Sequence, residues 1–186
     1  MNSILVILGV IGAAVLAAIG LYNRLVALRQ TTNQAWSDIE VQLKQRQDLV
    51  PQLVNIVKGY VKHEKETLNE VVAARNAAVS AGGAGQAKAE GVLGAALGKL
   101  FALAEAYPDL KANENFLQLQ DELGDVEDKI AASRRFYNNS VQEYNTATEQ
   151  FPSNLIAGPF NFLKRDFFES VEGREALQIP VNVEFE

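Results

Sequence analysis

The sequence predicts an all-α protein in which an N-terminal transmembrane helix continues into an elongated antiparallel bundle of long helices. Three observations lead to this fold class. An uninterrupted run of 18 apolar residues begins at Ile4. Two later regions repeat apolar residues at alternating steps of three and four, the spacing of one helix face. Only five of the 186 residues are proline, so few positions interrupt a helix.

The composition excludes several classes of function. The chain has no cysteine, which excludes disulfide scaffolds, thiolate metal sites and cysteine nucleophiles. His63 is the only histidine, so one chain cannot build a site from several histidines. A net charge of −6 argues against broad nucleic-acid binding, because such binding needs a basic face. We therefore expect no cofactor, no metal site and no nucleic-acid partner.

The segment from Ile4 to Leu21 has the length and composition of a membrane span. A helix of 18 residues rises about 27 Å, close to the roughly 30 Å of a bilayer's hydrocarbon core. Tyr22, Arg24 and Arg29 follow it, where an interfacial aromatic ring and snorkelling cations are expected as anchors. We divide the chain into a short tail at 1–3, a transmembrane helix at 4–22, a helical bundle at 23–179 and an extended tail at 180–186.

Two other interpretations of this segment are a cleaved secretory signal and a buried core helix. A signal carries positive charge before a shorter apolar core and ends at small residues. Only the terminal amine precedes this run, and the helical pattern continues beyond it, although Ala17 and Ala18 resemble a cleavage site. These features favour a permanent anchor in the lipid bilayer.

The charges next to the segment predict its orientation. No lysine or arginine precedes it, whereas Arg24, Arg29, Lys44 and Arg46 follow. Since positive charge favours the cytoplasmic side, we expect a single-pass membrane protein with its N-terminus outside and its body in the cytoplasm. The opposite placement, with the body periplasmic or extracellular, is the alternative.

Small residues recur on one face of the predicted membrane helix. Gly9, Ala13 and Ala17 are four residues apart, a spacing that lets two membrane helices approach closely. This stripe predicts a contact through which the chain forms a homo-oligomer.

The first long helix of the body is predicted over residues 24–80. Its stripe includes Trp36, Ile39, Leu43 and Val50, and it is wide enough to contact two neighbouring helices. Pro51 lies inside this pattern and removes one backbone hydrogen bond, which predicts a kink. Alternatively, Asp48 caps a new helix after a short break.

The rest of the body is predicted as three further helices. Residues 80–91 contain four glycines and predict a flexible reversal. Helices are then expected over residues 92–106, 109–149 and 155–177, with the third of these following a break at 152–154. The matching stripes predict antiparallel packing of residues 24–80 against 109–151.

A few charged residues interrupt the apolar stripes. Arg46, Glu64 and Arg75 fall at such positions in the first long helix, and Arg134 in the helix over 109–149. We interpret them as interhelical ion pairs that fix the register, and a buried catalytic or proton-handling cluster is the alternative. His63 and Glu64 are adjacent on a helix and point about 100° apart, a poor geometry for binding one metal ion.

The motifs of common enzymes do not occur. We find no glycine-rich phosphate loop, no serine nucleophile elbow and no paired-carboxylate pattern. We therefore expect a membrane-anchored scaffold without catalytic activity, which binds partner proteins or a second copy of itself. The alternative is an accessory that binds lipid or a small ligand, or an enzyme that uses Arg46, His63, Glu64 and Arg134.

Several blocks of the sequence carry a family resemblance. They are LYNRLV at 21–26, AWSDIEVQLK at 35–44, DLVPQLV at 48–54, VKGYVKHE at 57–64, EAYPDLKAN at 105–113, ASRRFYN at 132–138, YN at 144–145 and FPSN at 151–154. On these residues the chain resembles the LemA family of bacterial membrane proteins, over about residues 21–186. The resemblance implies one N-terminal helix in the bacterial cytoplasmic (inner) membrane, a cytoplasmic helical body and a role in the cell envelope, and it supplies no established activity.

Overall fold

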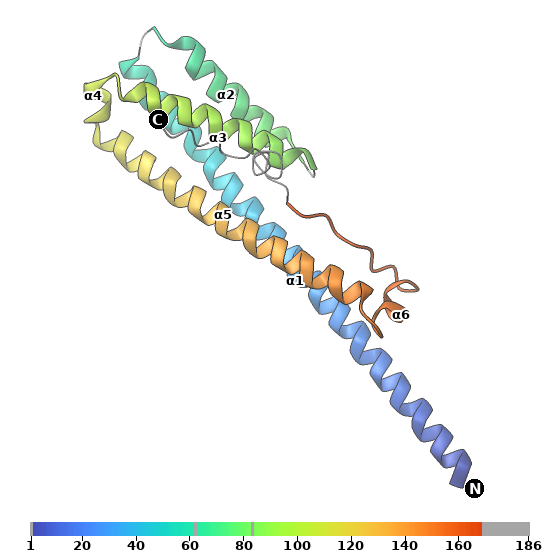
Figure 1. Ribbon diagram of the computed structural model, residues 1–186. Helices are drawn as coiled ribbons and strands as arrows, with labels where there is room; N and C mark the ends of the chain where they lie inside the picture. The colour runs from blue at the N-terminus through green and yellow to red at the C-terminus, as the bar shows by residue number, and fades with distance from the viewer. Residues whose placement is uncertain (1, 62, 83, 169–186) are drawn as a thin grey trace, which may run out of the picture. The chain divides into compact units, whose positions relative to one another are not determined.

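A computed structural model describes residues 2–61, 63–82 and 84–168 (Figure 1). The helices are α1 (Asn2–Tyr60), α2 (Lys65–Ser80), α3 (Ala84–Ala104), α4 (Pro108–Lys111), α5 (Glu114–Glu149) and α6 (Asn154–Ala157). The residues that the structure describes contain no β-strand. The all-α class and the long apolar N-terminal helix are confirmed. The tail predicted at 180–186 lies outside the described residues.

The chain divides into two compact units, and α1 and α5 contribute residues to both. Among the described residues, unit 1 contains 2–39 and 132–167, and unit 2 contains 40–61, 63–82, 84–131 and 168.

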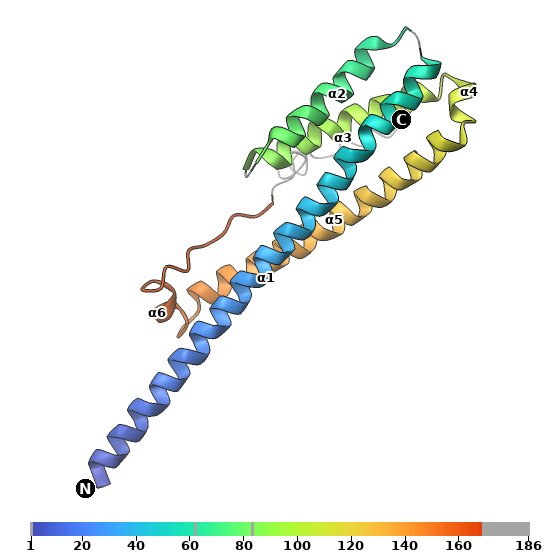
Figure 2. The same ribbon diagram turned by 180° about the vertical axis from the view of Figure 1, so that it is seen from behind.

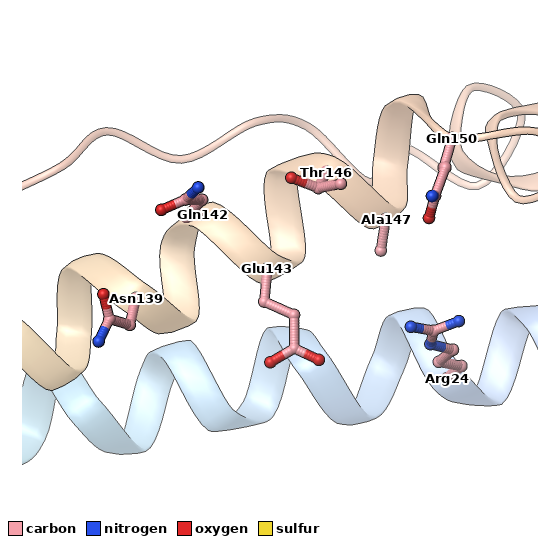
Figure 3. Close-up of a pocket in the computed structure, with 7 residues that line it drawn as sticks. All are labelled: Arg24, Asn139, Gln142, Glu143, Thr146, Ala147 and Gln150. Carbon is pink, nitrogen blue, oxygen red and sulfur yellow. The ribbon is translucent and has the colours of Figure 1, made fainter.

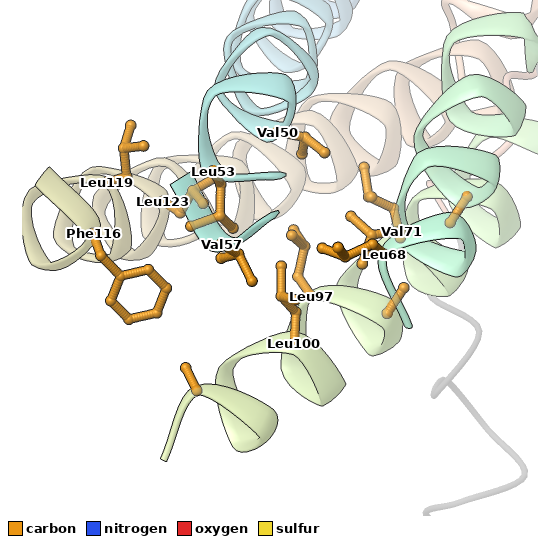
Figure 4. Packing of buried hydrophobic residues seen from close by; sticks show 14 of the residues in the cluster. Val50, Leu53, Val57, Leu68, Val71, Leu97, Leu100, Phe116, Leu119 and Leu123 are labelled. Atoms are coloured by element: carbon orange, nitrogen blue, oxygen red, sulfur yellow. The ribbon is translucent and has the colours of Figure 1, made fainter. Parts of the chain in front are cut away.

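Unit 2 is a bundle of four helical segments that alternate in direction. Figures 1 and 2 show α2 running back along the end of α1, α3 running back along α2, and the start of α5 running back again. Their apolar faces meet in one core (Figure 4), which includes Val50, Leu53, Val57, Leu68, Val71, Leu97, Leu100, Phe116, Leu119 and Leu123. Full burial of such a side chain stabilises the fold by about 1.5–3 kcal/mol, so this core holds unit 2 together.

Unit 1 pairs the first part of α1 with the end of α5. Leu25 of α1 shares a small core with Tyr144 of α5, and the rings of Trp36 and Tyr137 meet edge to face at 5.3 Å. Because the later residue of α1 meets the earlier residue of α5, the two helices are antiparallel within this unit. Ala157 and Phe162 complete the core from the segment after α5.

The predicted continuous helix over residues 24–80 is wrong in one respect. α1 ends at Tyr60, and α2 begins at Lys65. Val61 is buried in the same core as Leu68 and Val71, so the reversal lets both apolar stripes pack on one cluster. The three-four rhythm continued across this point and could not reveal the turn.

Pro51 lies within α1, which is continuous across it. The alternative of a break capped by Asp48 is therefore wrong, and the kink at Pro51 stays a prediction. The proline side chain is exposed on the helix surface.

The glycine-rich connection predicted at 80–91 is mostly helix, because α3 begins at Ala84 rather than near 92. Only Gly82 and Gly83 are adjacent glycines. The residues that follow are rich in Ala, Gln, Lys and Glu, which are good helix formers and extend α3 backwards.

The helix predicted at 109–149 is divided. Pro108 opens the single turn of α4, where a proline needs no backbone N–H, and α5 begins at Glu114. Asn113 caps α5, since its Oδ1 accepts a hydrogen bond from the Phe116 N–H at 3.0 Å. Its Nδ2 donates to the Tyr60 hydroxyl at 2.9 Å, which joins the start of α5 to the end of α1.

The helix predicted at 155–177 is also wrong over the described residues. α6 covers only Asn154–Ala157, and residues 162–168 have no regular structure. Gly158 and Pro159 follow α6, and Asn161 has a positive φ of 58°, which does not continue a helix. The part of this prediction after Phe168 lies outside the described residues.

Candidate functional site

The beginning of α1 is an apolar helix that packs against nothing in the described chain. An 18-residue window starting in this helix has a mean hydropathy of 2.9, and none of it is buried. Ten large apolar side chains between Ile4 and Ile19 are more than half exposed. The interpretation as a buried core helix is therefore wrong, and the helix is a candidate membrane span by its length and composition.

The small-residue stripe is open. Gly9, Ala13 and Ala17 are exposed, and a Cβ atom added to Gly9 would meet no atom within 4 Å. The stripe is thus accessible to another helix, and its role in self-association stays a prediction.

The residues predicted to anchor the span differ in their surroundings. The Tyr22 ring meets the rings of Phe160 and Phe162 edge to face, at 5.0 and 5.5 Å. The guanidinium of Arg29 lies 4.9 Å from the centre of the Phe162 ring, a cation–π contact. Arg24 is exposed instead. Tyr22 and Arg29 therefore pack against aromatic rings of the segment after α5.

Arg24 lines an open groove of about 360 Å³ between α1 and α5 of unit 1 (Figure 3). The other lining residues are Asn139, Gln142, Glu143, Thr146, Ala147 and Gln150. In Figure 3 the side chains of Arg24 and Glu143 extend from facing helices into the space between them. The groove combines one cation, one carboxylate and several amides, so it offers no strong preference for a charged ligand.

Hydrogen bonds fix the segment after α6 to the helices of unit 1. The side chain of Asn145 donates to the Arg165 carbonyl at 2.8 Å and accepts from the Arg165 N–H at 2.9 Å. Arg165 Nη2 donates to Asn33 Oδ1 at 2.6 Å, and the Tyr137 hydroxyl donates to the Asp166 carbonyl at 3.0 Å. We call residues 158–167 the strap, because it links α5 back to α1.

Unit 2 contains a buried polar cluster centred on Arg46. Arg46 is 3% exposed and forms an ion pair with Glu90, which is 5% exposed. Its Nη2 also donates to the Glu90 carbonyl at 3.0 Å, and its Nη1 donates to Glu127 Oε2 at 2.6 Å. Gln47 Nε2 donates to Glu90 Oε1 at 2.6 Å, and Arg75 Nε donates to the Gln47 carbonyl at 3.1 Å.

This cluster has the properties of a structural ion pair. One Glu90 carboxylate oxygen accepts a hydrogen bond from Arg46 and the other accepts one from Gln47, so both oxygens are engaged within the fold. Arg46 and Glu90 come from α1 and α3, so their pairing sets the register between these helices. In the part of the chain that the structure describes, no group of three His, Cys, Asp or Glu residues is placed to hold a metal ion.

Comparison with known proteins now identifies the family, because the LemA family matches residues 35–185. The chain belongs to the LemA family. The magnetosome protein MamQ of Magnetospirillum gryphiswaldense is 26% identical over 174 residues, which cover 79% of this chain and 64% of that protein. MamQ 2 of Paramagnetospirillum magneticum is 26% identical, over 80% of this chain and 64% of its own length.

A protein named LemA is also similar. The LemA protein of Metamycoplasma hominis is 26% identical over 164 residues, or 87% of this chain and 75% of that protein. The match to the MamQ relatives spans less than two thirds of their length. The resemblance to the LemA family, predicted from blocks of sequence, is confirmed.

The structure of this LemA family chain gathers only part of the polar set singled out in the sequence, since Arg75 joins the cluster around Arg46 through the Gln47 carbonyl. Glu64 is the residue before α2, and about 14 helical residues, or about 21 Å, separate Arg46 from the end of α1. His63 is exposed. Arg134 belongs to unit 1 and also has an interaction partner.

Sequence reasoning missed the partners of Arg46. Glu90 fell in the region interpreted as a flexible connection, and Gln47 and Glu127 were not singled out. A signal was available, since a step of three back from the buried Leu93 gives Glu90 on the same helix face. The contacts of the strap with Asn145 and Tyr137 left no comparable pattern in the sequence.

We predict that Arg46→Met lowers the free energy of unfolding by about 3–5 kcal/mol, because it leaves the buried Glu90 carboxylate without its cation. Thermal or urea unfolding of the full chain in detergent, followed by circular dichroism, measures this loss. Lys44→Met is the matched control, since Lys44 pairs with Asp48 on the exposed surface and contributes less than about 1 kcal/mol.

Glu90→Gln in the Arg46→Met background should restore part of the lost stability, because it removes the unpaired buried charge. Equal losses for Arg46→Met and Lys44→Met would contradict the assignment of a structural ion pair.

We also predict that unit 1 loses stability in alkaline solution. Burial raises the pKa of Tyr137 and Tyr144 above the ordinary value of 10.0, and the nearby Arg165 partly opposes this rise. Both tyrosines therefore ionise at lower pH in the unfolded chain than in the folded one, and stability present below pH 10 falls as the pH rises further. Unfolding measured between about pH 9 and 11, with tyrosinate absorbance as a second signal, tests this. Tyr144→Phe should reduce the slope, and an unchanged slope would contradict the prediction.

Proposed function

We propose that this LemA family chain is a single-pass, membrane-anchored helical scaffold of the bacterial envelope, without catalytic activity. Residues 4–22 anchor it in the bilayer, and its helical body binds partner proteins or a second copy. The observation that supports the proposal most is the unburied apolar window of α1, which continues without a break into the packed part of the same helix.

The size of the exposed apolar surface supports membrane insertion. Monomeric proteins in water rarely expose contiguous apolar patches above a few hundred Å². Leu, Ile and Val each favour the centre of a bilayer by about 0.3–0.6 kcal/mol on insertion scales. Ten such side chains and no charge before Arg24 therefore favour the bilayer as the environment of this segment.

Continuity of α1 favours an anchor over a cleaved signal. Cleavage near Ala17 and Ala18 would cut the middle of a helix and leave a new terminus within two turns of Leu25, which is buried in the core of unit 1. Mass spectrometry of the mature N-terminus tests this step. A mature chain that begins near Ile19 or Gly20 would refute the anchor.

The inner membrane and a cytoplasmic body are part of the same proposal. Arg24 and Arg29 follow the span, and no basic residue precedes it, which favours insertion with the body in the cytoplasm. Protease digestion of spheroplasts separates the two orientations. Protection of the body supports the cytoplasmic placement, and digestion from outside would refute it.

A role without catalysis is supported by the polar residues. Arg46 and Glu90 form a buried ion pair that joins α1 to α3, and Glu64 is the residue before α2. The MamQ relatives are named for the magnetosome, which is a cellular structure and not a reaction. Both observations favour an organising role over an enzymatic one.

We predict that charge in the middle of the span detaches the chain from membranes. The double variant Leu8→Arg, Ile11→Arg places two cations where each costs about 2.5–3.5 kcal/mol on insertion scales. The parent chain should remain in the membrane pellet after carbonate extraction, and the variant should move largely to the supernatant. Val72→Arg, at an exposed apolar position of α2, is the control and should remain in the pellet. A parent chain that is extracted would refute the anchor.

We also predict that the chain has neighbours in the membrane. The chain has no cysteine, so Ala13→Cys introduces a single thiol on the small-residue stripe. Oxidation in native membranes should join two copies through this position and much less through Ile11→Cys, which faces about 200° away on the helix. Chemical crosslinking of the parent chain with mass spectrometry then reports protein partners. A chain that crosslinks to nothing in either experiment would contradict the scaffold.

A further inference from the structure

The segment after α5 exposes large apolar side chains and carries no charge. Residues 150–163 contain no Asp, Glu, Lys or Arg, although both flanking residues, Glu149 and Lys164, are charged. Within this run Phe151 is 77% exposed and Leu163 is 69% exposed, and Leu155 and Phe160 are also exposed. A run of this kind is unusual on a surface that faces water.

The segment lies beside the end of the candidate membrane span. Tyr22 is the first residue after the apolar run, and its ring is 5.0 Å from that of Phe160. Phe162 and Ala157 pack with Leu25, less than one turn further along α1. Figures 1 and 2 both show α6 next to α1 at the point where the unpacked part of α1 begins.

These contacts set the depth of the segment. If Leu21 ends the hydrocarbon span, Tyr22 lies in the interfacial layer, which is about 5–7 Å thick on each side of the bilayer. Phe160 is in ring contact with Tyr22 and so lies at the same level. Aromatic side chains are the residues enriched in this layer.

Hydrogen bonds hold the segment in place. Ser153 Oγ donates to the Ala147 carbonyl at 2.6 Å, and the Phe162 N–H donates to the Ala157 carbonyl at 2.9 Å. Asn145 fixes Arg165 at the end of the run. The exposed side chains of Phe151, Leu155 and Leu163 therefore belong to an ordered segment, and the residues that the structure describes do not cover them.

We propose that residues 151–163 form a second membrane contact, in which Phe151, Leu155, Phe160 and Leu163 enter the boundary between headgroups and acyl chains beside α1. This inference rests on the proposed anchor, because the span places the segment at the membrane surface. The occupant is lipid and not a protein partner, since the segment is uncharged and aromatic, and its Phe160 ring contacts Tyr22 at the end of the span. Two points of attachment then fix the tilt and rotation of unit 1 at the bilayer.

Single cysteines test this contact, because the parent chain has none. Phe151→Cys and Leu163→Cys each receive an environment-sensitive fluorophore, and the full chain is reconstituted into phosphatidylcholine and phosphatidylglycerol vesicles. Leu8→Cys reports the span. Phe136→Cys is the matched control, because Phe136 is 51% exposed, belongs to unit 1 and lies about 20 Å along α5 from Glu149.

Lipids brominated near the headgroup should quench the labels at 151 and 163 at least threefold more than the label at 136. Lipids brominated deep in the acyl chain should quench the label at 8 most. Quenching at 151 and 163 no greater than at 136, with the label at 8 quenched, overturns the second contact and leaves the anchor standing. Labels at 151 and 163 that are shielded from both brominated lipid and aqueous iodide are covered by protein, which also overturns it. Absence of quenching at 8 overturns the anchor itself.

Discussion

The apolar surface of residues 4–21 is the constraint on which the rest of this chain depends. No other part of the described chain covers it, and water cannot solvate ten exposed large side chains without cost. A bilayer removes that cost, and the backbone of this segment already satisfies its own hydrogen bonds as a helix. Since α1 is a single helix to Tyr60, the element that carries this exposed apolar surface also supplies Leu25 to the core of unit 1 and Val50, Leu53 and Val57 to the core of unit 2.

Different interactions hold the helices together in the two units. Unit 2 uses a broad apolar core, and a buried ion pair between Arg46 and Glu90 joins α1 to α3. Unit 1 has a smaller core and relies on aromatic contacts and on hydrogen bonds from Asn145 and Arg165 that hold the strap. The Asn145 side chain bonds to the backbone of Arg165. These bonds hold the strap in one path, along which the chain leaves α5 and returns to α1.

The sequence predicted the helices in which buried apolar residues repeat at a regular spacing. It missed the features that depend on a single contact. The apolar run and the stripes of α1 and α5 were predictable, because burial on one face repeats every three or four residues. The turn at 61–64 was not, because Leu68 and Val71 continue the rhythm of α1 while belonging to a helix that runs the other way. The sequence did not reveal the start of α3, because the glycines there predicted a flexible connection although their neighbours favour helix. Glu90, the partner of Arg46, lies in the same stretch and was missed for this reason. The strap depends on Asn145 and Tyr137 bonding to backbone atoms about 20–30 residues later, and no local pattern encodes such a contact.

The same distinction between repeated burial and single contacts bears on the proposed function. The buried polar side chains around Arg46 in unit 2 are joined by hydrogen bonds to Glu90. The large apolar side chains that the described residues leave exposed are concentrated in unit 1, on the first part of α1 and on residues 151–163. Contact with acyl chains would bury these side chains and gain the free energy that water withholds from them. This gain is the physical basis of the proposed membrane role of this LemA family chain.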